Sequence, residues 1–155
     1  MPGPIDLKLA ELGITLPTPM PPIANYVPYV VTGNLVVVSG QVPAVDGKIA
    51  ITGQVGAGVS PERGKEAARL CFINLLVHLK AACGSDLNRV RRVVRLGGFV
   101  ASPPGFIDHA QVMNGASDLA VAVFGDAGRH ARTTIGVPGL PAGAAVEVEG
   151  MFEIS

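Results

Sequence analysis

One arginine in the C-terminal third of the sequence stands where it could bind an anion. Arg132 follows a glycine-rich loop containing Gly125 and Gly128, and precedes Thr133 and Thr134 at the start of a predicted strand. A guanidinium is planar and permanently charged, and its paired N–H donors fit the two oxygens of a carboxylate. Taken alone, an arginine at a strand edge is more often a surface charge, so a binding role needs support from other polar residues of the same site.

Other familiar chemistries lack their residue patterns. The sequence has no Gly-x-Ser-x-Gly elbow, phosphate-binding loop, Cys-x-x-Cys pair or His-x-x-x-His helix. Cys71 and Cys83 are interpreted as reduced, partly buried thiols. The three histidines, His78, His109 and His130, are scattered and are interpreted as surface or helix-end residues. The sequence also has no zinc-ligand spacing, so no metal site is expected.

Composition narrows the class of protein. The chain has 155 residues, the length of one domain, and is 48% hydrophobic and 15% charged, as globular proteins are. Twelve basic and twelve acidic side chains cancel, which argues against a strongly nucleic-acid-binding or membrane-binding surface. The strongest local cluster of charge in the sequence consists of Arg89, Arg91, Arg92 and Arg95. Alternation along a strand would divide it between two faces, favouring a solvated or intersubunit role over nucleic-acid binding.

Targeting signals are not evident. Residues 1–14 contain Asp6, Lys8 and Glu11, so they lack the apolar core of a signal peptide. No run approaches the roughly 18 apolar residues of a membrane span. A cytoplasmic location is expected. Residues 1–24 are predicted to be an N-terminal extension, with a short helix over 5–12 and an extended, proline-rich connector (Pro17, Pro19, Pro21, Pro22). Residues 25–155 are predicted to form the single domain.

Periodicity predicts the elements of that domain. Strands are expected over 26–31 and 35–39, around a turn at 32–34, and a second turn at Asp46-Gly47. Ser60-Pro61 predicts the start of a helix that Gly84 ends. The expected elements then continue as a strand over 88–102, a helix over 106–124, and strands over 133–137 and 145–154. In the strand over 88–102, Val90, Val94, Leu96 and Val100 are expected to share one face.

The order β-β-α-β-α-β-β predicts an α+β fold, with one mixed sheet and both helices on one face. The last strand carries Val146, Val148, Phe152 and Ile154 on one side, and Glu147, Glu149 and Glu153 on the other. Its second face is therefore polar, and such a face meets water or another subunit.

Two runs of sequence resemble the Rid/YjgF family of reactive intermediate deaminases, once called L-PSP endoribonucleases. The first is Gly33-Asn34-Leu-Val-Val-Val-Ser39-Gly40-Gln41-Val-Pro43, and the second is Ala131-Arg132-Thr-Thr134-Ile, continuing to Leu140-Pro141 and Val146-Glu147-Val-Glu149. The resemblance covers roughly residues 26–153. It implies a chorismate-mutase-like fold and a homotrimer with sites in the clefts between subunits.

The resemblance also implies roles for individual residues. Arg132 matches the arginine that binds the carboxylate of a 2-imino acid, and Glu147 matches the glutamate that holds or activates the hydrolytic water. Tyr26 matches a tyrosine whose hydroxyl enters the cleft. Ser39, Asn114 and Thr134 match further substrate-binding positions. The implied reaction is hydrolysis of a 2-imino acid to a 2-oxo acid and ammonia, without a cofactor.

The sequence departs from the family pattern at several of these positions. Thr134 replaces the usual cysteine, and Ala24-Asn25 replaces Gly-Pro before Tyr26. His130-Ala131 precedes Arg132 where a proline or alanine followed by a small residue is usual. Two alternatives to deamination stay open. One is a trimer that binds or senses a small carboxylate without chemistry. The other is an endoribonuclease, against which the zero net charge and the lack of a paired His/Lys acid–base set count.

Overall fold

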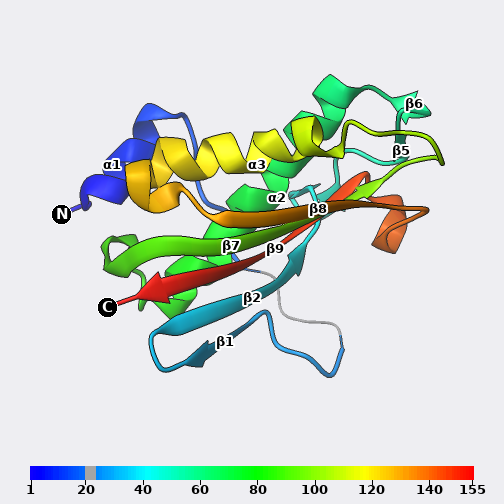
Figure 1. Cartoon of the computed structure of the whole chain (residues 1–155). Helices are drawn as coiled ribbons and strands as arrows, with labels where there is room; N and C mark the ends of the chain where they lie inside the picture. The colour runs from blue at the N-terminus through cyan, green and yellow to red at the C-terminus, as the bar shows by residue number, and fades with distance from the viewer. Residues whose placement is uncertain (20–23) are drawn as a thin grey trace.

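The computed structural model of the chain describes residues 1–19 and 24–155. Its centre is a five-stranded sheet in the order β1-β2-β9-β7-β8, in which β7 and β8 are parallel and the other neighbours antiparallel (Figure 1). The five strands of this sheet are β1 (Tyr29–Thr32), β2 (Leu35–Gln41), β7 (Val90–Ala101), β8 (Ala131–Val137) and β9 (Val146–Ile154). The predicted α+β class and the mixed sheet are confirmed.

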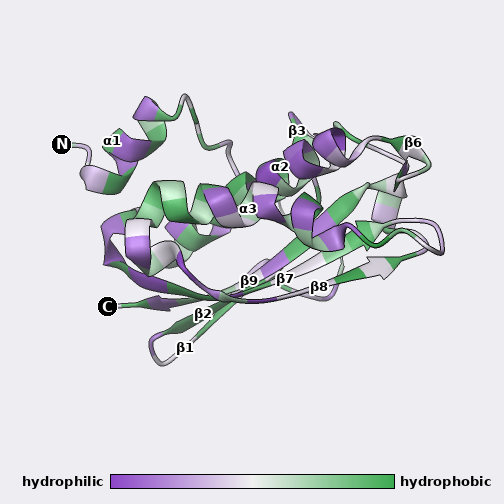
Figure 2. Cartoon of the chain, turned by 45° about the horizontal axis from the view of Figure 1, so that its top comes forward, coloured by the Kyte–Doolittle hydropathy of each residue, from purple (hydrophilic) through white to green (hydrophobic). Residues whose placement is uncertain are grey.

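Two long helices cover one face of the sheet (Figure 2). Helix α2 (Pro61–Ala82) begins as predicted, because the Ser60 side chain accepts a hydrogen bond from the Arg63 backbone N–H at 3.1 Å. Helix α3 (His109–Phe124) starts three residues later than expected. The fully buried residues of the two helices form the apolar stripe that packs on the sheet. They are Ala67, Ala68, Cys71, Phe72, Leu75, Leu76 and Leu79 of α2, and Val112, Met113, Ala116 and Ala120 of α3.

The opposite face of the sheet, called the open face below, has no helix over it within the described chain (Figure 2). Strand β9 alternates as predicted: Val148 and Phe152 are buried against the helices, while Glu147 and Glu149 are only half-buried on the open face. The prediction for β7 was wrong at one position. Register shifts beside Val93 place this residue in the core and leave Val94 half-buried, which breaks the simple alternation.

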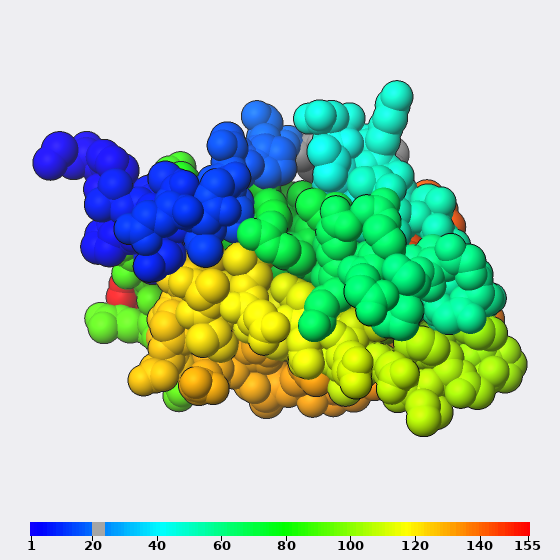
Figure 3. Space-filling model, turned by 90° about the horizontal axis from the view of Figure 1, so that it is seen from above, coloured from blue at the N-terminus to red at the C-terminus, as the bar shows by residue number. Residues whose placement is uncertain are grey.

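The N-terminal segment packs on the helices. Helix α1 (Pro4–Glu11) is followed by a turn, and Leu9 and Ile14 belong to the buried core. Lys80 of α2 forms an ion pair of 3.1 Å with Asp6. Figure 3 shows the segment, in blue, lying along α2 and α3 on the helical side of the molecule. The predicted connector includes Pro21 and Pro22, which lie outside the described residues.

Short elements complete the chain. A hairpin of β3 (Ala44–Val45) and β4 (Lys48–Ile49) turns at Asp46-Gly47, both with positive φ, which confirms the predicted turn. The remaining short elements are β5 (Gln54–Val55), β6 (Gly58–Val59), and the 3-10 helices at Leu87–Arg89, Gly125–Gly128 and Pro141–Gly143. None of the helices in the described part of the chain is long and apolar enough to cross a membrane.

Candidate functional site

Arg132 lies on edge strand β8, with its guanidinium against α3. Its Nη1 donates to Asn114 Oδ1 at 2.8 Å and to Ser117 Oγ at 3.1 Å. Its Nη2 donates to the backbone oxygen of Ala110 at 3.4 Å. These three acceptors come from one face of the helix, because residues spaced by four and then three positions along a helix lie in a row. The helix therefore orients the guanidinium.

All three acceptors are electrically neutral. Among the residues that the structure describes, no carboxylate lies within ion-pair distance of Arg132. A half-buried guanidinium that is held in place but not neutralised attracts an anion, since its charge is less screened than on an open surface. The arrangement around Arg132 is thus that of a cationic anchor rather than a structural ion pair.

Thr134 lies two residues further along β8, on the same face as Arg132. Its hydroxyl oxygen is buried, and it has no hydrogen-bond partner among the described residues. A buried hydroxyl without a partner destabilises the fold by its desolvation. The sequence suggested a substrate-binding role for Thr134, but in this conformation its oxygen has no access to solvent.

We expect Thr134→Val to stabilise the protein and to leave its activity intact. Valine keeps the shape of threonine and removes the unpaired hydroxyl, so the free energy of unfolding should rise by about 1 kcal/mol. Urea unfolding, followed by circular dichroism, measures the change. A variant that unfolds more easily and loses turnover would show that the hydroxyl makes a hydrogen bond in the working protein.

Glu147 lies on the open face, next to an irregularity in β2. Ser39 and Gly40 form a bulge in the pairing of β2 with β9. A side chain at position 40 would collide with the Glu147 carboxylate, so the glycine makes room for this carboxylate beside the strand. Burial, followed by the negative charge of Glu149, raises the pKa of Glu147 above its usual value. A carboxylate with a raised pKa is a better proton acceptor.

The bulge is also hydrogen-bonded to the segment that carries Tyr26. The Ser39 hydroxyl donates to the backbone oxygen of Val27 at 2.7 Å, and the Ser39 N–H donates to that of Pro28 at 2.9 Å. Tyr26 itself is 59% exposed. The structure thus groups Ser39, Gly40 and Glu147, with Tyr26 on the adjoining segment.

The predicted site residues form two groups on opposite faces of the sheet. Arg132, Asn114 and Thr134 lie on the helical face, and Glu147 and Ser39 on the open face. In the strand register, Arg132 is level with Gly150, three positions along β9 from Glu147, and β7 lies between the two strands. With strand spacings of about 4.8 Å and a rise of about 3.3 Å, their Cα atoms are roughly 14 Å apart. One copy of the chain does not bring these residues together.

Two residues that the sequence interpretation missed belong to the Arg132 group. Ser117 contacts Arg132, and its hydroxyl lies 2.9 Å from His130 Nε2. Ser117 is three positions after Asn114 in the predicted helix, and this spacing is the signal that could have found it. The interpretation of the histidines as surface or helix-end residues holds for His109, the first residue of α3, whose Nε2 lies 3.2 Å from Ser102 Oγ. It is wrong for His78, which lies inside α2 and is only 8% exposed. His130 is half-buried. Both cysteines are free and buried, as predicted.

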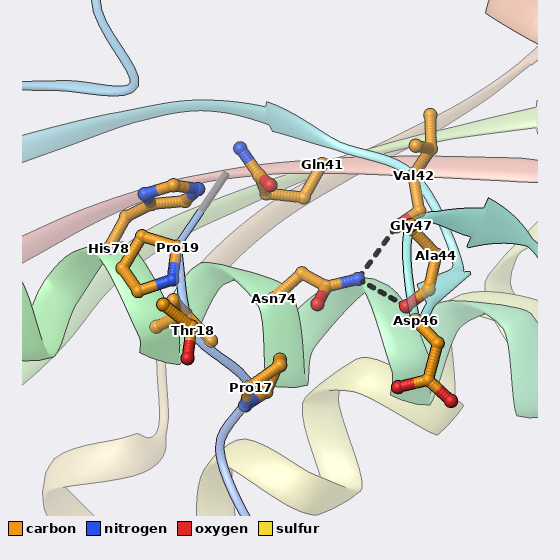
Figure 4. Close-up of a pocket in the computed structure, with 11 residues that line it drawn as sticks. Pro17, Thr18, Pro19, Gln41, Val42, Ala44, Asp46, Gly47, Asn74 and His78 are labelled. Atoms are coloured by element: carbon orange, nitrogen blue, oxygen red, sulfur yellow. Dashed lines mark hydrogen bonds between the residues drawn. The ribbon is translucent and has the colours of Figure 1, made fainter. Parts of the chain in front are cut away.

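A separate cavity lies between the N-terminal segment, the end of β2 and α2 (Figure 4). Its volume is about 560 Å³, and Pro19, Gln41, Asn74 and His78 are among its lining residues. The amide nitrogen of Asn74 is fully used in hydrogen bonds to two backbone oxygens of the neighbouring loop. None of the six predicted site residues lines this cavity.

The described residues contain no cluster of three or more metal-binding side chains. The two groups of site residues contribute a guanidinium, a carboxylate, hydroxyls and an amide. Together these side chains can bind an anion and accept a proton from water.

The fold and these two groups of residues define a class of protein. The family model described as "YjgF/chorismate_mutase-like, putative endoribonuclease" matches residues 6–153. The chain belongs to the YjgF/chorismate mutase-like family. The match includes most of the N-terminal segment, so the family model extends beyond the predicted boundary at residue 24.

Individual relatives are similar over almost their whole length. Protein TCP17 of Trypanosoma cruzi is 47% identical, over 99% of this chain and 96% of that protein. The crystal structure of Atu1372, a protein of unknown function from Agrobacterium tumefaciens, is 48% identical, with a TM-score of 0.91 over 97% of this chain and 92% of that one. A structure from Shewanella oneidensis, described as an endoribonuclease on a provisional basis, is 35% identical, with a TM-score of 0.92 over 97% and 99% of the two chains.

Proposed function

We propose that this protein is a hydrolytic deaminase of small imines and enamines that carry a carboxylate. The observation that carries the proposal is Arg132, a half-buried guanidinium that three neutral acceptors hold and no described carboxylate neutralises. Such a group fits the carboxylate of a 2-imino acid and fixes the C=N carbon at a set distance from the arginine.

The remaining step needs a water and a proton acceptor. In the proposed reaction, Glu147 takes a proton from water as the water oxygen bonds to the imine carbon. The electron pair of the C=N double bond moves to nitrogen, which takes the proton held by Glu147. Glu147 then transfers the hydrogen of the new hydroxyl to nitrogen as the C–N bond breaks, so that ammonia leaves and the carbon becomes the carbonyl of a 2-oxo acid. The raised pKa of Glu147 favours this role, because it brings the carboxylate closer to the basicity that a general base needs. The imine is already electrophilic, so positioning supplies much of the rate enhancement.

Because the two groups lie on opposite faces of one sheet, we propose that each site forms between two copies of the chain. Arg132 of one copy would face Glu147 and Ser39 of the next. The open face supports such an association, since it exposes apolar side chains: Val30 at 51%, Val37 at 38% and Ile135 at 47%. The homotrimer implied by the family resemblance is the proposed assembly.

The test is an assay in which an amino-acid oxidase generates imino acids in the presence of the purified protein. We expect faster release of ammonia and 2-oxo acid than in the oxidase reaction alone, because hydrolysis in free water is then no longer the only route. Semicarbazide, which traps the imine, gives an independent readout. Binding of pyruvate without any acceleration would favour the carboxylate-binding alternative. Cleavage of RNA that depends on Arg132 would favour the ribonuclease.

A further inference from the structure

The hydrogen bonds of Arg132 determine which of its donors a substrate can reach. A guanidinium has five N–H donors: one on Nε and two on each Nη. Both hydrogens of Nη1 are used, by Asn114 and Ser117, and one hydrogen of Nη2 is used by the backbone of Ala110. Among the described residues, Nε–H and the second hydrogen of Nη2 have no acceptor, so these are the donors that remain.

These two remaining donors share one edge of the guanidinium plane. Ala110 and Asn114 are one helical turn apart on α3, so the edge formed by Nη1 and Nη2 faces the helix. The edge formed by Nε and Nη2 then faces away from it. A carboxylate that meets this edge lies in the guanidinium plane and accepts two parallel hydrogen bonds.

The position of the Ser117 hydroxyl depends in turn on His130. The His130 Nδ1 atom lies 2.6 Å from the backbone oxygen of Gly128, which can only accept, so Nδ1 carries the hydrogen. In the neutral ring Nε2 then has a lone pair, and it accepts the Ser117 hydroxyl hydrogen at 2.9 Å. Burial lowers the pKa of His130 and favours this neutral form. With its hydrogen directed at His130, Ser117 presents a lone pair to Arg132 Nη1.

We propose that Ser117 and His130 are positioning residues that restrict Arg132 to its Nε/Nη2 edge, so that a substrate carboxylate is bound in one plane and in one orientation. This inference rests on the proposed function. Without His130, the Ser117 hydroxyl is free to rotate, and Nη1 loses a fixed acceptor. The guanidinium can then turn, and a bound carboxylate is no longer held in one orientation.

Three variants separate the parts of this arrangement. His130→Asn keeps a donor near the position of Nδ1 and removes the acceptor at Nε2, whereas His130→Gln places an amide oxygen near Nε2 and is the matched control. Ser117→Ala removes the hydroxyl between histidine and arginine. For each variant we would measure KM and kcat with imino acids generated in situ. Calorimetry would give the dissociation constant of pyruvate.

We expect His130→Asn and Ser117→Ala each to raise KM, and the dissociation constant of pyruvate, roughly three- to tenfold, with kcat little changed. His130→Gln should resemble the wild-type protein. The double variant should match Ser117→Ala alone, because both residues act along one path.

Wild-type KM values in both His130→Asn and Ser117→Ala would overturn the inference. So would a His130→Gln variant that is as impaired as His130→Asn, because the acceptor at Nε2 would then have no role. Failure of the proposed function itself looks different: Arg132→Ala would then retain full turnover. If Arg132→Ala is inactive while the Ser117 and His130 variants behave as wild type, only the positioning inference fails.

Discussion

Replacement of Arg132 by alanine should abolish deaminase turnover while the protein remains folded. Among the described residues, the guanidinium of Arg132 is the cation that the proposed site offers to a substrate carboxylate, and its loss removes that partner. Removing one member of a buried, hydrogen-bonded charge pair costs about 2–5 kcal/mol, so kcat/KM should fall by roughly thirtyfold to several thousandfold. The oxidase-coupled assay measures the loss.

Two further variants serve as controls for Arg132→Ala. Arg129 is a neighbouring arginine whose side chain is 73% exposed, and Arg129→Ala should leave turnover unchanged. Arg132→Lys keeps the charge but not the planar fork, and should recover only part of the activity. If Arg132→Ala hydrolyses imino acids at the wild-type rate, the carboxylate anchor is elsewhere and the proposed deaminase site is wrong.

Replacement of Glu147 by glutamine should lower kcat far more than it changes the affinity for pyruvate. Glutamine fills the same space beside Gly40 but does not accept a proton from water. A general base contributes typically 10²- to 10⁴-fold to the rate, so roughly a hundredfold loss or more is expected. Single-turnover measurements isolate the hydrolytic step. Unchanged kcat in this variant, together with retained pyruvate binding, would favour the non-catalytic binding protein.

The pH profile of the wild-type enzyme gives a second measure of Glu147. Burial and the nearby Glu149 raise its pKa, and the base is active only as the carboxylate. Activity should therefore be lost on acidification at a higher pH than it would be if Glu147 had the ordinary glutamate pKa of 4.5. Glu149→Gln removes the like charge and should move this acid limb to lower pH. No shift of the limb in Glu149→Gln would show that another group controls it.

The same pKa shift determines how Glu147 affects stability. Between the unfolded and folded pKa values, the folded state binds more protons than the unfolded state. The contribution of Glu147 to the free energy of unfolding therefore decreases as pH rises through that window. At neutral pH the ionised Glu147 therefore lowers the free energy of unfolding, so Glu147→Gln should be at least as stable as the wild-type protein. The expected loss of activity in this variant would then not be a loss of fold.

Local chemistry made much of the fold predictable from the sequence. Ser60-Pro61 located the start of α2, Asp46-Gly47 located a hairpin turn, and the alternation of Glu147 and Glu149 with buried valines identified the two faces of β9. The pattern failed in β7, because a bulge depends on pairing with a neighbouring strand and has no signature within the strand itself.

The site was predictable only in part. Arg132 and Glu147 could be named from the family resemblance, but which face each occupies relative to the other depends on strand order and register. The roles of Ser117 and His130 depend on side-chain contacts between α3, the loop after it and β8. Such contacts follow from packing that no single segment encodes.

The central claim is that Arg132 and Glu147 of different copies build one deaminase site, and a mixed assembly of two inactive variants tests it most directly. Arg132→Ala and Glu147→Gln would be co-expressed with different affinity tags and purified on both. In a cyclic trimer that contains both variants, one site joins an intact Arg132 to an intact Glu147, so roughly a third of wild-type activity should return. A mixed assembly no more active than its two parents would contradict the claim.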